Sequence, residues 1–278
     1  MIRFDLLFSK TTRRRIRKFV YFPTDLLNFF FRKKGVLLPP QGLNFVGDGN
    51  FIEIGNRFLK YFINLGQLKP YHQVLDIGCG IGRMAIPLTG YLDSRAGYEG
   101  FDIIPEGIHW CQKNITPVFP NFHFQLADII NKEYNPHGRH AASEYTFLYK
   151  NEVFDFVILT SIFTHMLPDE VDQYLSEIYR VLKPNSTIFS TFFLLNDESR
   201  RQMQRNKNRL NFKHSLGGGA CYSINKKVLE SAIAYDEIYI REIFEKFKLL
   251  IQEPISYGSW AGRDNFLDYQ DIIVAKKN

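Results

Sequence analysis

Short apolar runs alternate with segments of helical periodicity through the middle of the chain. The runs have the length of strands, and they lie at about residues 74–77, 97–102, 122–128, 154–159 and 187–194. Between them the pattern predicts helices over about 83–91, 106–114 and 168–182, the last with apolar residues at Val171, Leu175, Ile178 and Leu182. Strands that alternate with helices are typical of a parallel sheet with helices on its faces, so the predicted fold class is α/β.

One junction between a strand and a helix carries the clearest signal for a ligand. Residues 76–83 read Asp-Ile-Gly-Cys-Gly-Ile-Gly-Arg. Glycines suit such a turn because they adopt positive φ without penalty and let a ligand approach the main chain. In an open α/β sheet this turn lies at the carboxyl end of the strands, where ligands bind. A dinucleotide fingerprint needs its third glycine at position 83, where Arg83 stands, so the spacing does not favour a pyrophosphate.

This junction resembles motif I of the class I S-adenosylmethionine (SAM) methyltransferases. In that family the glycines let the backbone lie against the ribose and methionine parts of SAM. The resemblance covers about residues 70–195, including the sequence Val181-Leu182-Lys183-Pro184 between a helix and a strand. It implies a Rossmann-like, seven-stranded, mostly parallel sheet. An antiparallel hairpin from about 249–257 and 270–275, after a helix over about 236–247, would close that sheet.

The same resemblance implies a cofactor site for SAM. Asp102 ends the second strand, 24 residues after Gly78, where motif II has an acid whose two oxygens can accept both ribose hydroxyls. Asp128 ends the third strand, where similar enzymes place the acid that accepts from the adenine amine. The cofactor-binding residues implied are Asp76, Gly78, Cys79, Gly80, Gly82, Arg83, Asp102, Ile103, Asp128, Ile129 and Thr160.

His165, just after the fourth strand, is the candidate general base. Histidine has an unperturbed pKa of about 6.5, so a neutral ring can accept a proton near neutral pH. The alternative is a structural histidine at the start of a helix, whose ring bonds a backbone carbonyl. After this strand the sequence lacks the Asn/Asp-Pro-Pro-Tyr of enzymes that methylate the amino groups of bases or glutamine. Spacing identifies no trio of metal-binding carboxylates, so no metal is predicted.

The chain length of 278 residues and the apolar content of 45% allow one large α/β domain, predicted over residues 41–278. Residues 131–152 and 196–230 are expected to be insertions in it. Three widely spaced cysteines, Cys79, Cys111 and Cys221, predict reduced thiols in a cytoplasmic protein rather than disulfides or a zinc site.

Two loops are candidates for the mouth of the site. One is the turn-rich loop at 44–51, which leads into a predicted helix over about 52–65. Its aromatic residues and Asp48 are candidates to cover the cofactor or substrate, and a plain connection is the alternative. The other is the loop at 257–263, which holds Tyr257, Trp260 and two glycines and is expected to be flexible and near the substrate.

Basic charge is concentrated in a predicted arm over residues 1–40. The net charge of the chain is +6, yet residues 1–38 hold ten Lys/Arg against two acids, which leaves the rest nearly neutral. Pro23, Asp25 and Asn28 keep every apolar run well short of the roughly 20 residues that span a bilayer. Thr24 is placed to cap a short helix from Asp25. The arm can contact a membrane interface, its own domain or a second subunit, or nucleic acid, of which the last is least favoured.

These features favour a cytoplasmic SAM-dependent methyltransferase, held at the inner face of the membrane if the arm binds lipid. Its acceptor would be a hydroxyl of a small molecule, a sugar or a lipid-linked glycan. The glycan class rests on the arm and on a loose resemblance to bacterial methyltransferases of surface-polysaccharide pathways. The alternatives are an RNA methyltransferase with the arm on phosphates, and a non-catalytic membrane adaptor that keeps the SAM fold. Neither the acceptor nor the oligomeric state follows from the sequence.

Overall fold

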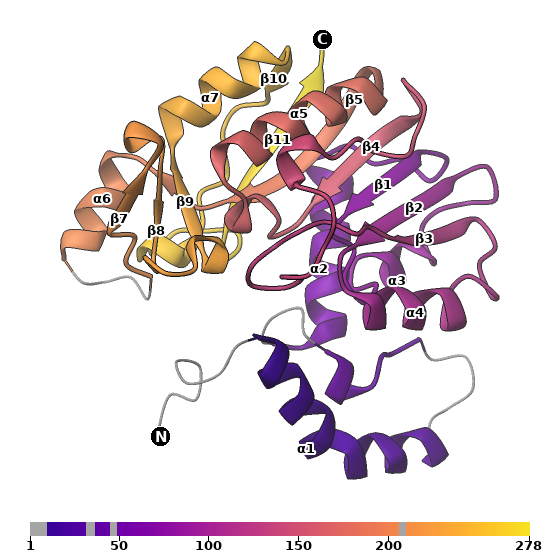
Figure 1. Ribbon diagram of the computed structural model, residues 1–278. Coiled ribbons are helices and arrows are strands. Elements are labelled where there is room, and N and C mark those ends of the chain that lie inside the picture. The colour runs from indigo at the N-terminus through magenta and orange to yellow at the C-terminus, as the bar shows by residue number, and fades with distance from the viewer. Residues whose placement is uncertain (1–9, 32–36, 45–48, 206–209) are drawn as a thin grey trace.

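A seven-stranded sheet forms the centre of the protein in this computed structural model, which describes residues 10–31, 37–44, 49–205 and 210–278. The strand order is β10-β11-β5-β4-β1-β2-β3 (Figure 1). Five strands run parallel: β1 (Gln73–Ile77), β2 (Gly97–Asp102), β3 (Phe122–Leu126), β4 (Phe154–Leu159) and β5 (Leu182–Phe192). The strand β11 (Asp271–Lys277) is antiparallel to both β5 and β10 (Leu249–Ile251). The predicted Rossmann-like sheet with an antiparallel closing hairpin is therefore confirmed.

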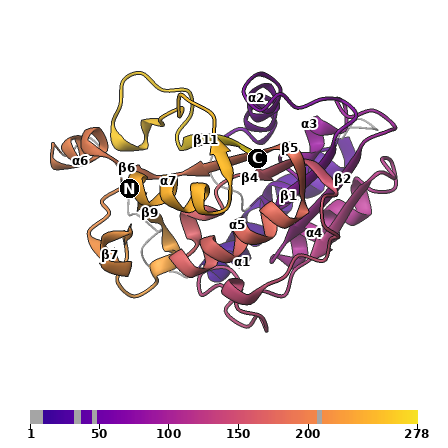
Figure 2. The same cartoon turned by 90° about the horizontal axis from the view of Figure 1, so that it is seen from above.

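Helices cover both faces of this sheet. Successive strand residues point to opposite faces, so Val74 and Phe156 join one core while Leu75 and Val157 join the other. The first core lies under α2 (Phe51–Asn64), α3 (Ala85–Leu88) and α4 (Pro105–Asn114). The second lies under α5 (Pro168–Val181) and α7 (Glu237–Lys246), as Figure 2 shows from above. Burial on both faces explains why the strand sequences are almost continuously apolar.

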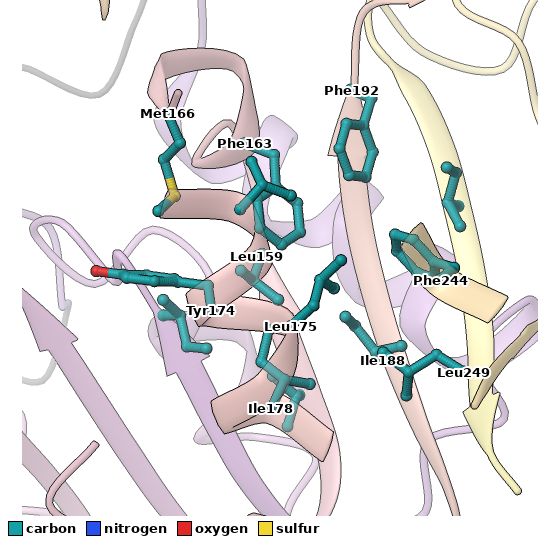
Figure 3. Close-up of a cluster of buried hydrophobic side chains, with 14 of the residues drawn as sticks. Leu159, Phe163, Met166, Tyr174, Leu175, Ile178, Ile188, Phe192, Phe244 and Leu249 are labelled. Carbon is teal, nitrogen blue, oxygen red and sulfur yellow. The ribbon is translucent and has the colours of Figure 1, made fainter. Parts of the chain in front are cut away.

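The second core joins the middle of the sheet to its antiparallel edge. Figure 3 shows side chains from α5, β4, β5, α7 and β10 meeting in one cluster. Phe163 stacks on Phe192, with 4.8 Å between ring centroids, and Phe192 contacts Phe244 edge to face. The labelled members are Leu159, Phe163, Met166, Tyr174, Leu175, Ile178, Ile188, Phe192, Phe244 and Leu249.

A second, four-stranded sheet follows β5 in the order β6-β9-β8-β7. It comprises β6 (Leu194–Leu195), β7 (His214–Leu216), β8 (Cys221–Ser223) and β9 (Ile233–Asp236), with α6 (Asp197–Gln204) beside it. The described residues of the segment predicted as an insertion at 196–230 include α6, β7 and β8, so this segment carries part of the second sheet. Single-turn 3-10 helices complete the chain: η2 (Gln41–Leu43), η3 (Ala142–Glu144), η4 (Phe163–His165), η5 (Gly217–Gly219), η6 (Leu229–Ser231) and η7 (Ser259–Ala261).

Several predicted boundaries were wrong. The helix expected over 83–91 is regular only across Ala85–Leu88, because turns that include Gly82 and Gly90 flank it. The strand β5 begins at Leu182, directly after α5, rather than near residue 187. The predicted short helix capped by Thr24 is instead part of one helix, α1 (Lys10–Phe31), which continues through Pro23. A proline inside a helix removes one backbone hydrogen bond and can bend the helix without ending it. Asp48 lies outside the described residues.

The predicted flexible loop at 257–263 is part of the core. Trp260 is buried, and its indole Nε1 donates to Asp271 at 2.6 Å. The same carboxylate accepts from the backbone N–H groups of Gly258 and Leu194, each at 2.6 Å, and Arg263 Nη1 lies 3.6 Å from it. Burial raises the pKa of Asp271 to about 7. This carboxylate therefore fastens the loop, β6 and β11 together, and the aromatic residues that suggested a substrate mouth serve packing.

None of the helices within the described ranges is long and apolar enough to cross a membrane.

The Asp271 network predicts a large stability effect. Asp271→Ala leaves three buried donors without their acceptor and removes a carboxylate beside Arg263, so it should lower the free energy of unfolding by about 3–5 kcal/mol. The exposed Asp264 in the same segment is the control, and its change to alanine should alter stability by less than about 0.5 kcal/mol. Urea titration measures both variants. Equal stability of the two would show that the network is not a structural anchor.

Candidate active site

The glycine turn after β1 lies against the end of β2. Gly78, Gly80 and Gly82 all have positive φ, at 76°, 58° and 80°. A side chain at Gly78 would also collide with Ile162, whose Cδ1 lies 2.0 Å from the position a Cβ would take. The backbone N–H groups of Gly78 and Cys79 donate to the carbonyl of Phe101 at 2.8 and 3.1 Å. The turn is therefore fixed to the neighbouring strand by its own backbone.

Asp102, the last residue of β2, completes this attachment. One carboxylate oxygen accepts from Gly80 N–H at 2.8 Å, and the other accepts from Ile104 N–H at 2.8 Å. The side chain is largely buried and lines the cavity described next. Each carboxylate oxygen has more than one acceptor site, so both can accept further hydrogen bonds from a ligand.

A cavity of about 450 Å³ opens beside this turn at the carboxyl end of the central strands. Gly78, Cys79, Gly80, Arg83, Asp102, Ile103, Ile129, Thr160 and His165, all predicted site residues, line it. Asp76, Gly82 and Asp128 were predicted to bind the cofactor but do not line it. The structure thus brings most of the predicted residues together, and the exceptions have identifiable reasons.

Asp76 is buried beneath the turn rather than exposed in the cavity. The hydroxyl of Tyr98 donates to Asp76 Oδ2 at 2.6 Å. Burial raises the pKa of Asp76 to about 7, the hydrogen bond from Tyr98 opposes that rise, and nearby Asp102 adds to it. Gly82 is likewise below the surface, against Ile115 and Cys111. Both residues are buried in the fold and do not line the cavity.

Asp128 is engaged by the predicted insertion at 131–152. Arg139 pairs with its carboxylate through Nε, and the backbone N–H of Arg139 donates to the other oxygen at 3.2 Å. These hydrogen bonds lower the pKa of Asp128. In place of this side chain, the following residues Ile129, Ile130 and Asn131 line the cavity. The sequence predicted that Asp128 ends the third strand, whereas β3 ends two residues earlier at Leu126, and the direction of the Asp128 side chain depends on Arg139.

His165 in η4 combines the two roles that the sequence left open. Its Nδ1 lies 2.7 Å from the carbonyl oxygen of Glu230 in η6. A carbonyl only accepts, so Nδ1 carries the proton and the neutral ring keeps the lone pair of Nε2. The ring lines the cavity, and the hydroxyl of Tyr134 lies 3.5 Å from Nε2. The bond to a backbone carbonyl thus orients the nitrogen that can take up a proton.

Several residues of the cavity were not predicted. Tyr134 comes from the insertion at 131–152, and Glu170 and Tyr174 come from α5. Phe193 and Leu210 precede β6 and β7 of the second sheet, and Tyr269 and Gln270 precede β11 of the main sheet. Burial, the largest effect, raises the pKa of Glu170, whose carboxylate also accepts from Leu167 N–H at 2.7 Å. The predicted insertions at 131–152 and 196–230, which contain Tyr134 and Leu210, gave a sequence signal, because functional loops concentrate in such segments.

Two other chemistries have little support in the described part of the chain. No group of three or more His, Cys, Asp and Glu residues is placed there to hold a metal ion. Burial, the main cause, raises the pKa of Cys79 well above its ordinary value, so this thiol is not a ready nucleophile.

Comparison with known proteins gives the class. The sequence matches the family model described as "Methyltransferase domain" over residues 68–248, more than half of the chain. The chain belongs to this family, which together with the fold confirms the predicted class of enzyme, a SAM-dependent methyltransferase. The family match does not identify the molecule that accepts the methyl group.

Solved structures share the fold at low identity. A protein from Pyrococcus horikoshii OT3 is 17% identical with a TM-score of 0.56, over 84% of this chain and 93% of that one. Magnesium protoporphyrin IX methyltransferase from Synechocystis PCC 6803, with bound S-adenosylhomocysteine (SAH), is 18% identical with a TM-score of 0.51, over 84% and 90%. Burkholderia thailandensis 1,6-didemethyltoxoflavin-N1-methyltransferase is 15% identical with a TM-score of 0.51, over 97% and 89%. Similarity at this level concerns the fold alone.

The raised pKa of Asp76 predicts a pH dependence of stability. The folded pKa of about 7 exceeds the ordinary value of 3.8, so the folded protein binds this proton more tightly than the unfolded chain. Its stabilising contribution is complete below about pH 4 and is lost as pH rises through 7. Relative to wild type, Asp76→Asn should therefore gain roughly 3–4 kcal/mol between pH 4 and pH 8.

The control is Tyr98→Phe, which removes the hydrogen bond that opposes the shift. It should raise the folded pKa of Asp76 further and extend the loss of stability to higher pH. Chemical denaturation across this pH range measures all three proteins. A stability difference between Asp76→Asn and wild type that does not change with pH would contradict a buried, proton-binding Asp76.

Proposed function

We propose that this enzyme transfers the methyl group of SAM to a hydroxyl of a small molecule, a sugar or a lipid-linked glycan. The observation that carries the proposal is the orientation of His165. Its Nδ1–H is fixed on the Glu230 carbonyl, so its proton-accepting nitrogen is Nε2, on a ring that lines the same cavity as Asp102 and the glycine turn. A hydroxyl must lose its proton when it is methylated, and a positioned base serves this step.

The residues on the cavity wall fit SAM as the methyl donor. Asp102 offers a carboxylate with remaining acceptor capacity, and the backbone of the turn at 78–80 carries little side-chain bulk. Asp102 would hold the ribose hydroxyls, and Ile103 and Ile129 would supply apolar contacts to the nucleoside. When bound, SAM supplies a methyl group activated by a sulfonium whose leaving group is a neutral thioether.

The chain itself supplies alignment and a proton acceptor. The cavity positions the acceptor hydroxyl, and alignment of reactants accounts for much of the rate enhancement in such reactions. His165 Nε2 takes up the hydroxyl proton, and the Glu230 carbonyl stabilises the resulting imidazolium through the Nδ1–H bond. Tyr134, whose hydroxyl lies 3.5 Å from Nε2, is positioned to orient the same acceptor group.

The chemistry of the lining supports a neutral, ring-containing acceptor. Aromatic side chains of Tyr134, Tyr174, Phe193 and Tyr269 line the cavity. Within the described residues, Arg83 is the one lysine or arginine in the lining, and it lies over the ring of Phe51. A polyanion such as RNA would call for more basic residues around the site. Aromatic faces bind the apolar faces of rings, including those of sugars.

Two variants separate cofactor binding from proton transfer. Asp102→Ala should weaken SAM binding by roughly 100-fold, because it removes a charged hydrogen-bond acceptor from the site. His165→Ala should bind SAM as wild type does and lower methyl transfer by about 10²–10⁴-fold. Calorimetry measures binding, and labelled SAM with a fractionated metabolite extract measures transfer.

The matched control is His123→Ala, because His123 is exposed on β3 and pairs with Glu99. It should change neither quantity. If the His165→Ala variant transfers methyl groups at the wild-type rate, His165 is not the base. If the Asp102→Ala variant binds SAM with wild-type affinity, Asp102 is not part of the cofactor site.

A further inference from the structure

The helix α1 contacts the rest of the protein through polar groups. Asp25 accepts from the backbone N–H groups of Gln41 and Gly42 at 2.7 and 2.8 Å, and Arg17 Nε donates to the Gln41 carbonyl at 2.9 Å. Lys18 pairs with Glu106 in the first turn of α4 at 2.9 Å. These contacts fix which side of the helix faces the body. In Figure 1, α1 lies at the bottom of the molecule, far from α5 and α7.

The opposite side of α1 is apolar and exposed. Phe19, Phe22 and Phe30 have 84%, 63% and 71% of their surface exposed, and shorter apolar side chains accompany them. At about 100° per residue, the exposed apolar residues fall within an arc of about 160°, and the residues that contact the body fall outside it. The members of this apolar face are Ile16, Phe19, Val20, Phe22, Leu26, Leu27 and Phe30.

This arrangement is the reverse of an ordinary surface helix, which buries its apolar side against the core and leaves its polar side in water. A contiguous exposed apolar face of this kind marks an interaction site. The face also belongs to the most basic part of the chain, since residues 1–38 hold ten Lys/Arg against two acids. Its partner must therefore accept an apolar helix face and also carry negative charge.

We propose that α1 docks this enzyme on an anionic lipid bilayer, lying in the plane of the interface. The apolar face enters the boundary between headgroups and acyl chains, and the net charge of +8 over residues 1–38 attracts this part of the chain to anionic headgroups. A second copy of the chain is less suitable as an occupant, because pairing through this face would bring two segments of net charge +8 together. The inference goes beyond the proposed reaction and does not depend on it.

The anchor point places the lipid surface near the cavity. Lys18 is fixed to Glu106, two residues after Ile104, which lines the cavity. The start of α4 lies at the carboxyl edge of the sheet, as does the glycine turn. A bilayer under α1 would therefore lie on the side of the molecule to which a lipid-borne acceptor could be presented.

Vesicle sedimentation with the full chain tests the proposal. Binding to phosphatidylcholine vesicles that contain phosphatidylglycerol should exceed binding to pure phosphatidylcholine by at least about tenfold, and added salt should weaken it. The double variant Phe19→Ser, Phe22→Ser should lose about 100-fold in the partition coefficient, because two exposed apolar anchors are removed. Its SAM affinity and its unfolding transition should match those of wild type.

The matched control is the double variant Val118→Ser, Leu148→Ser, which removes two equally exposed apolar side chains from other parts of the surface. It should bind vesicles as wild type does. Failure of wild type to bind anionic vesicles would overturn the proposal, and so would equal loss in both double variants. Light scattering supplies a further outcome: a stable dimer that Phe19→Ser, Phe22→Ser dissociates would assign the face to a second copy instead.

Discussion

The attachment of the glycine turn to the end of β2 is the constraint on which the rest of the site depends. Phe101 and Asp102 accept hydrogen bonds from three successive N–H groups of the turn, at Gly78, Cys79 and Gly80. Two of these donors belong to Gly78 and Gly80, which have the positive φ angles that glycine adopts without penalty. Because these hydrogen bonds fix the turn to β2, the turn forms a part of the cavity lining that has no large side chains. Asp102 also lines the cavity, and its carboxylate oxygens can accept further hydrogen bonds from a ligand.

The orientation of His165 depends on the connection between β8 and β9 of the second sheet, where η6 places the carbonyl of Glu230 against Nδ1 of His165. The proposed base His165 lies in η4, after β4 of the main sheet, whereas the carbonyl that orients its ring comes from the predicted insertion at 196–230. Because Nδ1 of the ring donates to a carbonyl, Nε2 of the same ring is held in one orientation and can accept a proton. In the proposed mechanism this contact gives the predicted insertion a chemical role besides its contribution of Leu210 to the cavity.

The sequence predicted the order and type of the main-sheet elements because their signals are local: apolar runs of strand length, helical spacing and a glycine turn. It also located Asp102 and His165. It did not predict that Asp128 pairs with Arg139, that Trp260 is buried on Asp271, or that Glu230 orients His165. Each of these depends on a contact between residues distant in the chain or on the direction of one side chain, and spacing carries no information about either.

A crystal structure of the protein with SAH tests the central claim most directly, because it shows where the nucleoside lies relative to the turn. The account predicts the ribose hydroxyls within hydrogen-bonding distance of the Asp102 carboxylate, the nucleoside beside Ile103 and Ile129, and His165 facing the vacant position of the acceptor. Binding of SAH away from Asp102, or a turn that releases its bonds to β2 when the ligand binds, would contradict it.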